Sequence, residues 1–277
     1  MTELENNLRR IAAQKQELLI PENIRKNVKV LGITGTLEGG SGDITETEDY
    51  KNCYEITQDI LYSAGVTKNL LVKYDLSRYE TGSTIPNIVD SDVATISGAT
   101  YSKGEKGIIL DGACIITEDI NKAYGTVELF CKINSNFTPL QNSYWYNCSA
   151  IFGCELGDTQ QDFAVIIDKN GNFAIGYANS SVQSSNIKAN DGMFHHIVLT
   201  YESGNFYMYI DNVLATSVYY VMKGTVPITY GIFWNNAILN TTVKGEVVLF
   251  RYYDRVLNDE ERTINYNSCL NIYMGGE

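Results

Sequence analysis

The sequence predicts an all-β protein from residue 70 onward, preceded by a short helical and β segment. Apolar runs of four to eight residues recur from residue 70 to 253, separated by Gly, Asn and Asp. Residues 169–172 read Lys-Asn-Gly-Asn between two such runs, which predicts a hairpin. The length of 277 residues suits one large sandwich domain with an appendage.

The N-terminal part predicts an amphipathic helix over residues 1–20, ended by Pro21. Its apolar positions have the spacing of an interrupted heptad over fewer than three repeats; they are Leu4, Leu8, Ile11 and Leu18. A short helix and a β segment follow within residues 20–39, where Gly32 and Gly35 permit close chain approach. Residues 41–69 form an acidic linker and a bridge that suits either a short helix or an edge strand.

The strands predicted in the main domain begin with the apolar runs 70–75, 106–112, 125–132 and 149–154. Runs 163–168 and 173–177 flank the hairpin turn. Residues 191–214 predict two strands joined by a turn at 202–205, with a tight reversal at Asp211 and Asn212, residue types that tolerate positive φ. A last strand is predicted within 243–253. Asn258 then caps a short helix, with Glu261 placed for a capping box.

Several of these motifs resemble one known family. Phe-His-His-Ile-Val-Leu-Thr-Tyr at 194–201, followed after a Gly turn by Phe-Tyr-Met-Tyr-Ile-Asp-Asn at 206–212, is similar to the core hairpins of laminin-G-like domains. Runs 70–75, 106–112 and 125–132 and the C-terminal stretch 243–261 resemble further parts of that family, so the resemblance covers residues 70–270. It implies a concanavalin A-like jelly-roll sandwich over residues 70–277 and a role in recognition.

A second resemblance concerns residues 20–39. This segment is similar to one that recurs in tail and fibre proteins of bacteriophages infecting low-GC Gram-positive bacteria, ahead of a variable distal domain. The resemblance implies that residues 1–40 anchor the protein to other virion proteins and oligomerise it, as a homotrimer by analogy with tail fibres. We therefore expect a virion protein that is made in the cytoplasm of a bacterial host.

Composition argues against several classes of partner. The net charge is −12 and the 21 basic residues are scattered, whereas nucleic-acid binding needs clustered Lys and Arg. The sequence contains no run of about 20 apolar residues, so we expect no membrane span. The six cysteines are irregularly spaced and predict buried free thiols without a disulfide framework or a zinc site.

Catalytic and metal sites are not predicted. Retaining glycosidases need two carboxylates about 5 Å apart, but Glu128 and Glu246 each stand alone in their strands, so we expect no enzyme. His195 and His196 are adjacent in a strand and point to opposite faces, which favours structural, hydrogen-bonded roles. We expect no cofactor and no metal, because no oxygen-rich spacing is found among the loop aspartates Asp75, Asp90, Asp92, Asp111, Asp119 and Asp158.

Two aromatic, amide-rich stretches are the candidates for carbohydrate binding. Aromatic rings beside Asn and Gln suit the apolar face and hydroxyl rim of a sugar. The candidate residues are Tyr144, Trp145, Tyr146, Trp234, Asn235 and Asn236. Packing into the sandwich or into a subunit interface is an equally good interpretation.

The sequence therefore predicts a bacteriophage virion protein of the fibre or tail type. Its lectin-like domain is expected to bind host-surface glycans without covalent chemistry. The alternative is a structural fibre or decoration protein of tail, neck or capsid, whose sandwich makes only protein contacts.

Overall fold

The computed structural model of the protein describes residues 29–30, 33–34, 65–98, 100–120, 125–140, 144–154, 163–178, 181–221, 228–233 and 243–275. The chain divides into two compact units, each of which is described by itself. One is formed by residues 68–266. The described residues of the other are 29–30, 33–34, 65–67 and 267–275.

In the second of these units, strand β1 (Lys29–Val30) pairs antiparallel with strand β2 (Ile33–Thr34). The β segment predicted within residues 20–39 is thus present as a short strand pair. This unit also contains the end of helix α3 (Asp259–Cys269) and the π-helix η5 (Leu270–Gly275). The predicted helix at residues 1–20, and the linker and bridge up to residue 64, lie outside the described residues.

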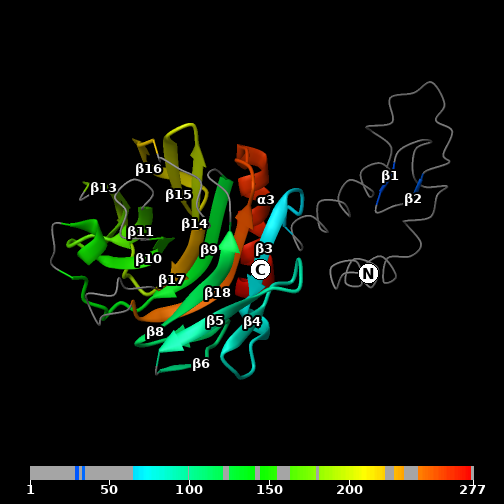
Figure 1. The fold of residues 1–277 in the computed structure, drawn as a ribbon, viewed down its shortest axis with the longest axis horizontal. Helices are drawn as coiled ribbons and strands as arrows, with labels where there is room; N and C mark the ends of the chain where they lie inside the picture. Colours follow the sequence, from blue (N-terminus) through cyan, green and yellow to red (C-terminus); the bar gives the residue numbers. More distant parts are fainter. Residues whose placement is uncertain are drawn as a thin grey trace. The chain divides into compact units, whose positions relative to one another are not determined.

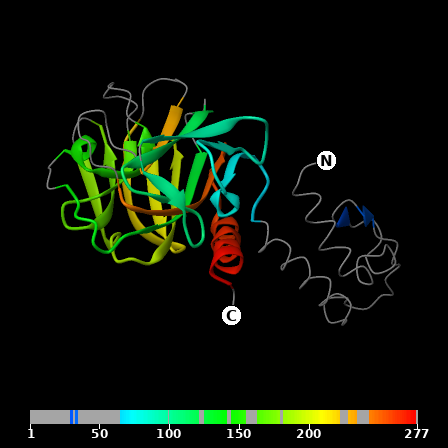
Figure 2. The ribbon, with the colours of Figure 1, turned by 90° about the horizontal axis from the view of Figure 1, so that it is seen from below.

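Residues 68–266 form two eight-stranded antiparallel sheets packed face to face (Figures 1 and 2), which confirms the predicted all-β sandwich. The first sheet has the order β13-β12-β11-β10-β17-β8-β5-β4. Its strands are β4 (Thr84–Pro86), β5 (Val93–Gly98), β8 (Ala113–Ile120), β10 (Ser149–Cys154), β11 (Phe163–Ile167), β12 (Asn172–Tyr177), β13 (Ser181–Lys188) and β17 (Ile228–Ile232).

The second sheet has the order β16-β15-β14-β9-β18-β7-β6, and β3 also pairs with β18. Its strands are β3 (Leu70–Asp75), β6 (Tyr101–Lys103), β7 (Ile108–Leu110), β9 (Gly125–Ile133), β14 (Phe194–Glu202), β15 (Asn205–Ile210), β16 (Val213–Tyr219) and β18 (Gly245–Tyr253). A 3-10 helix, η3 (Leu76–Arg78), follows β3. One side of β18 pairs with β9, while its other side pairs first with β7 and then with β3.

The two tight turns predicted within residues 191–214 have the expected backbone. Ser203 and Gly204, between β14 and β15, have φ of 52° and 86°. Asp211 and Asn212, between β15 and β16, have φ of 51° and 63°. Consecutive positive φ values are those of a two-residue hairpin turn whose twist matches the strands that it joins. These turns set the register of three neighbouring strands.

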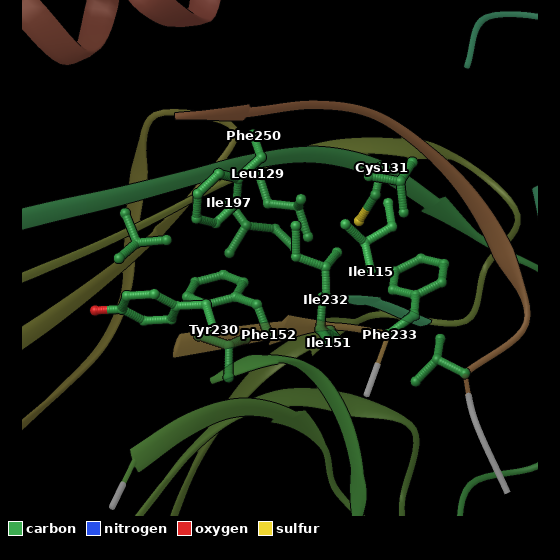
Figure 3. Packing of buried hydrophobic residues seen from close by; sticks show 14 of the residues in the cluster. Ile115, Leu129, Cys131, Ile151, Phe152, Ile197, Tyr230, Ile232, Phe233 and Phe250 are labelled. Carbon is green, nitrogen blue, oxygen red and sulfur yellow. The ribbon is translucent and has the colours of Figure 1, made fainter. Parts of the chain in front are cut away.

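The core lies between the sheets, because every second residue of a strand points toward the opposite sheet. In β9 the inward residues are Val127, Leu129, Cys131 and Ile133, and none is more than 3% exposed. Figure 3 shows inward side chains of both sheets meeting in this layer; the labelled ones are Ile115, Leu129, Cys131, Ile151, Phe152, Ile197, Tyr230, Ile232, Phe233 and Phe250.

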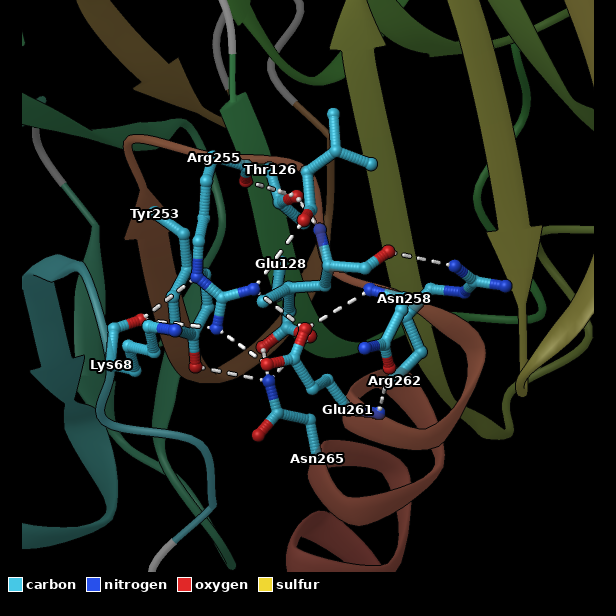
Figure 4. A network of polar contacts seen from close by, with 11 residues as sticks. Lys68, Thr126, Glu128, Tyr253, Arg255, Asn258, Glu261, Arg262 and Asn265 are labelled. Carbon is cyan, nitrogen blue, oxygen red and sulfur yellow. Dashed lines mark hydrogen bonds and ion pairs between the residues drawn. The ribbon is translucent and has the colours of Figure 1, made fainter.

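Helix α3 begins at the predicted capping box. The Glu261 backbone N–H donates to Asn258 Oδ1 at 2.9 Å, and the Asn258 N–H donates to Glu261 Oε2 at 3.1 Å. Arg255 adds a bidentate ion pair to the same carboxylate, with nitrogen to oxygen distances of 2.6 and 2.7 Å (Figure 4). The start of α3 is therefore fixed to the end of β18 by both polar pairs.

Candidate functional site

A small apolar cluster lies on the outward face of the first sheet, away from the core. Trp145, from the 3-10 helix η4 (Trp145–Asn147), is 3% exposed and forms its centre. The residues around it are mostly small and come from the end of η4 and from three adjacent strands; they are Cys148, Ala150, Ala164, Ile166 and Ala174. Because the alanine side chains are short, the indole can lie close against the sheet.

Two further contacts hold Trp145 in place. Its indole Nε1–H donates to the carbonyl oxygen of Ala178 at 2.5 Å. A Cβ atom at Gly176 would lie 2.5 Å from Trp145 Cβ, so only glycine lets η4 approach β12 this closely. The sequence left two interpretations open for Trp145, sugar binding and packing. The structure favours packing, because the indole ring is buried.

Tyr144 and Tyr146 are held by this buried tryptophan. Their rings are stacked, with centroids 5.5 Å apart and planes 6° from parallel. Tyr146 is half-buried and meets the Trp145 ring edge-on at 6.2 Å. Tyr144 is 49% exposed. We call Tyr144 and Tyr146 the tyrosine pair. The Tyr144 ring is open to solvent on one side and stacks on Tyr146, which in turn contacts the buried Trp145.

Trp234, Asn235 and Asn236 lie outside the described residues, so their meeting with the tyrosine pair stays a prediction. The residue before them, Phe233, is fully buried in the core. Its backbone N–H donates to the carbonyl oxygen of Ile151 in β10, at 2.7 Å. Phe233 is the last described residue before this stretch. Its hydrogen bond therefore attaches the chain there to β10, the strand that directly follows η4.

The two histidines point to opposite sides of the second sheet, as predicted. On the core side, His195 Nδ1 lies 2.7 Å from Asp211 Oδ2, and its Nε2 lies 3.2 Å from Asp191 Oδ2. The ring also meets Phe173 of the first sheet edge-on at 5.3 Å. Burial alone would lower the pKa of His195, but the hydrogen bonds and charges of Asp211 and Asp191 outweigh it and raise the pKa.

His196 occupies the outward side and differs from the prediction. It is 1% exposed, yet neither ring nitrogen makes a hydrogen bond among the described residues. Its Nε2 lies 3.7 Å from Glu128 Oε1. Burial lowers the pKa of His196, and the Glu128 charge only partly offsets this effect. The hydrogen-bonded role predicted for the histidines is confirmed for His195 alone.

Glu128 belongs to a buried polar cluster beneath α3 (Figure 4). Asn265 Nδ2 lies 2.8 and 2.9 Å from the two carboxylate oxygens, and Arg251 NH1 lies 3.4 Å from Oε2. All three side chains are at most 1% exposed. This cluster could not be predicted from the sequence, since the partners of Glu128 are 123 and 137 residues away in the chain. The one sign of such a cluster in the sequence is that Glu128 is a single acidic residue within an apolar strand.

Glu246 also has a structural role. Its Oε1 accepts the backbone N–H of Gly107 at 2.8 Å and that of Lys106, and Lys132 Nζ lies 3.2 Å from its Oε2. Both strand carboxylates therefore bind protein groups in this structure. The expected lack of catalytic activity stays a prediction.

Three of the loop aspartates, Asp75, Asp90 and Asp111, also contact neighbouring protein groups. Asp75 Oδ1 accepts from the Ser77 hydroxyl at 2.5 Å, Asp90 Oδ1 accepts from Asn87 Nδ2 at 2.8 Å, and Asp111 pairs with a lysine. Within the described ranges, no three His, Cys, Asp or Glu side chains are grouped closely enough to hold a metal ion. The expected absence of a metal site stays a prediction.

The cysteines that the structure describes form no disulfide bond. Cys131, Cys148, Cys154 and Cys269 are buried and Cys114 is partly exposed, which confirms the predicted buried thiols for four of them; Cys53 lies outside the described residues. Burial, with a smaller effect from the Asp168 charge, raises the pKa of Cys148 to about 11. None of the helices in the described part is long and apolar enough to span a membrane.

Comparison with known proteins gives one family and a set of similar folds. The family model of the concanavalin A-like lectin/glucanases superfamily matches residues 111–261. No curated protein sequence matches the chain significantly. A structure of the Trypanosoma rangeli sialidase in complex with sialic acid is 14% identical with a TM-score of 0.60, and the match covers 83% of this chain but 40% of the sialidase.

Two further structures are similar as well. Domain 4 of an extracellular arabinanase from Geobacillus stearothermophilus, in complex with arabinotriose, is 17% identical with a TM-score of 0.55. That match covers 72% of this chain and 98% of the domain. The binding domain of botulinum neurotoxin serotype D is 14% identical with a TM-score of 0.51, over 72% of this chain and 51% of that one. At these identities the likeness shows a shared fold.

Proposed function

Because the chain belongs to the concanavalin A-like lectin/glucanase superfamily, we propose that its sandwich binds carbohydrate without cleaving it, at the surface that carries Tyr144. One observation carries this proposal: an exposed ring stacked on Tyr146, which rests on buried Trp145. A tyrosine ring can pack against the apolar face of a sugar while its hydroxyl bonds the rim. The sialic acid and arabinotriose bound in two similar folds support this ligand class.

We further propose that the protein is a bacteriophage virion component that presents this domain to the host surface. The support is the resemblance of residues 20–39 to tail and fibre proteins. Residues 1–40 would attach the protein to other virion proteins and oligomerise it. Weak binding at each copy would then be strengthened by repetition on the particle.

A purely structural role is the second candidate, and one feature favours it. Exposed apolar side chains gather at the edge of the second sheet, on β15, on β16 and just after it; they are Tyr207, Val213, Leu214, Tyr219 and Val221. Apolar residues grouped at a sheet edge are typical of protein contacts. In this alternative the sandwich would contact virion proteins through that edge and bind no sugar.

Matched tyrosine variants of the full chain separate the two candidates. Tyr144, just before η4 on the outward side of the first sheet, is 49% exposed, and Tyr207, in β15 of the second sheet, is 39% exposed. We expect Tyr144→Ala to weaken binding to host cells and to a glycan array by about 1–3 kcal/mol, while Tyr207→Ala leaves it unchanged. If Tyr207→Ala abolishes assembly into particles and no glycan is bound by wild type, the structural role is the correct one.

A further inference from the structure

We infer that helix α3 is a pH-sensitive lid on the second sheet, which acidification releases while the sandwich stays folded, and that His196 is the residue that senses the acid. This device acts whether or not the sandwich binds carbohydrate. Its basis is the position of His196, which lies between β14 and α3 and is 1% exposed. Neither nitrogen of its ring makes a hydrogen bond within the part of the chain that the structure describes.

Four parts of the chain surround His196 in addition to its own strand. The Tyr266 ring of α3 lies 5.9 Å from the imidazole, between centroids. Glu128 of β9 places Oε1 3.7 Å from Nε2, and Arg251 of β18 faces the same carboxylate, with NH1 3.4 Å from Oε2. Asp211, in the turn between β15 and β16, accepts the backbone N–H of His196 at 2.9 Å. Because the imidazole is covered, water reaches it only when one of these parts moves.

A protonated His196 is poorly stabilised in this enclosure. Both carboxylate oxygens of Glu128 already accept from Asn265 Nδ2, at 2.8 and 2.9 Å (Figure 4), and the Arg251 guanidinium repels a second cation beside that carboxylate. A buried charge is costly unless it is paired and hydrogen-bonded. The imidazolium is therefore favoured in a state in which water can reach the ring.

The direction of the pH effect follows from the charges around His196. Burial lowers its pKa in the closed state; the Glu128 and Asp211 charges oppose this effect in part, and the Arg251 charge adds to it. Once α3 has moved away and the ring is hydrated, the pKa returns toward its ordinary value of about 6.5. The closed state is thus fully stabilised above that value and loses stability as the pH falls. Between the two pKa values, the ratio of open to closed molecules rises about tenfold for each pH unit.

Helix α3 is the neighbour of His196 that can leave most easily. Strands β9 and β18 are held by backbone ladders on both sides, whereas α3 reaches the sheet through side chains. Asn265 Nδ2 donates to the Tyr253 hydroxyl at 3.0 Å, and Asn212 Nδ2 donates to the Thr263 hydroxyl at 2.8 Å. An isolated helix of 11 residues is marginal in water, so its backbone amides exchange once it leaves the sheet. The capping box at Asn258 keeps the first turn attached and serves as the hinge.

Hydrogen exchange of the full chain between about pH 5 and about pH 8 tests this lid. Mass spectrometry of peptic fragments reports the protection of residues 259–266 and, separately, of β9 and β14. Each exchange rate is compared with that of the same fragment in unfolded protein, since the intrinsic rate also changes with pH. The chain has two histidines, so NMR of the two imidazole Cε1–H groups follows their protonation in the same samples.

His196→Gln is the informative variant, because glutamine stays uncharged over this range, and His195→Gln is its matched control. In wild type, protection of α3 should be constant above pH ~6.5 and fall about tenfold per pH unit below it, while β9 and β14 stay at least about tenfold better protected. His196→Gln should make the protection of α3 independent of pH. His195→Gln should keep the wild-type decline, and it also assigns the two NMR signals.

Three results would overturn the inference. Constant protection of α3 in wild type as the pH falls would show that no lid opens. Equal loss of protection in α3, β9 and β14 would mean that protonation unfolds the whole sandwich. A decline that persists in His196→Gln would assign the acid response to a carboxylate such as Glu128 or Asp211. If His196→Gln does not fold, the wild-type samples still decide, because the loss of α3 protection must begin in the pH range in which the His196 signal starts to titrate.

Discussion

At the scale of single residues, Tyr144 and Trp145 are neighbours with opposite roles. Trp145 is covered and hydrogen-bonded to Ala178, while Tyr144 is half-exposed on the same short 3-10 turn. A buried aromatic residue determines folding stability, whereas an exposed one is available to a ligand. The two substitutions therefore have different expected effects.

We predict that Trp145→Ala lowers the free energy of unfolding by about 3–5 kcal/mol, the usual range for a core Trp or Phe. Tyr144→Ala should change it by no more than about 0.5 kcal/mol, since its ring is at the surface. Urea unfolding followed by circular dichroism measures both. Equal losses in the two variants would show that Tyr144 is packed as firmly as Trp145.

The histidine pair predicts two separate pH windows of stability. The pKa of His195 is raised in the folded state, so its contribution is complete below the unfolded value of about 6.5 and is lost as the pH rises through the folded pKa. The pKa of His196 is lowered, so its contribution is complete above about 6.5 and is lost as the pH falls through the folded pKa.

Single variants separate these windows. The urea midpoint of wild type should decline both as the pH rises above ~6.5 and as it falls below that value. His195→Gln should remove the decline above this pH, and His196→Gln should remove the decline below it. Each variant serves as the control for the other. A wild-type slope that persists in both variants would assign the pH dependence to other groups.

At the scale of elements, helix α3 is joined to the second sheet by the Glu128 cluster. Glu128 belongs to β9, Arg251 to β18 and Asn265 to α3, so a single buried carboxylate connects three elements. Buried ion pairs contribute little net stability compared with apolar residues of the same shape, but removing one partner leaves the other charge uncompensated.

Glu128→Gln should therefore lower stability by about 3–5 kcal/mol, although the new side chain is nearly isosteric. The double variant Glu128→Gln/Arg251→Met should recover most of this loss, because it also removes the guanidinium that faced the carboxylate. Denaturant midpoints of the two single variants and the double variant test this as a cycle. If the two losses simply add, Arg251 and Glu128 are not energetically coupled.

Asn258→Ala should cost about 1 kcal/mol, the usual effect of losing an N-cap. The Glu261–Arg255 ion pair stays in place in that variant, so the loss measures the cap alone. Asn258→Asp keeps an accepting oxygen and is the matched control. A loss much larger than this in thermal unfolding would mean that α3 depends on the cap to dock.

Local chemistry explains which elements the sequence predicts well. Positive φ at Asp211 and the capping box at Asn258 depend on a few adjacent residues, and both are present as expected. Strands β4, β5, β6, β8, β13, β16 and β17 were not predicted, and two of them, β4 and β6, are only three residues long. The burial of Trp145 was not predictable either, because Ala150, Ala164 and Ala174 face it from three strands whose register is not visible in the sequence.

At the scale of the whole molecule, assembly through residues 1–40 is the main prediction. We expect the full chain to be a trimer in light scattering, and Leu8→Asp with Ile11→Asp to reduce it to monomers by placing charges on the predicted helix seam. The glycan affinity of each folded copy should not change. A wild-type monomer would remove the anchor interpretation unless other virion proteins are present.

The position of β18 has a consequence for biosynthesis. This strand occupies the middle of its sheet, between β9 on one side and β7 and β3 on the other, yet it is the last strand of the chain. A ribosome makes the N-terminal residues first, so the edges of β9, β7 and β3 that pair with β18 stay unpaired until residues 245–253 emerge. The sandwich can close only once residues 245–253 have been made, and a chaperone that shields bare strand edges would raise the yield of folded protein.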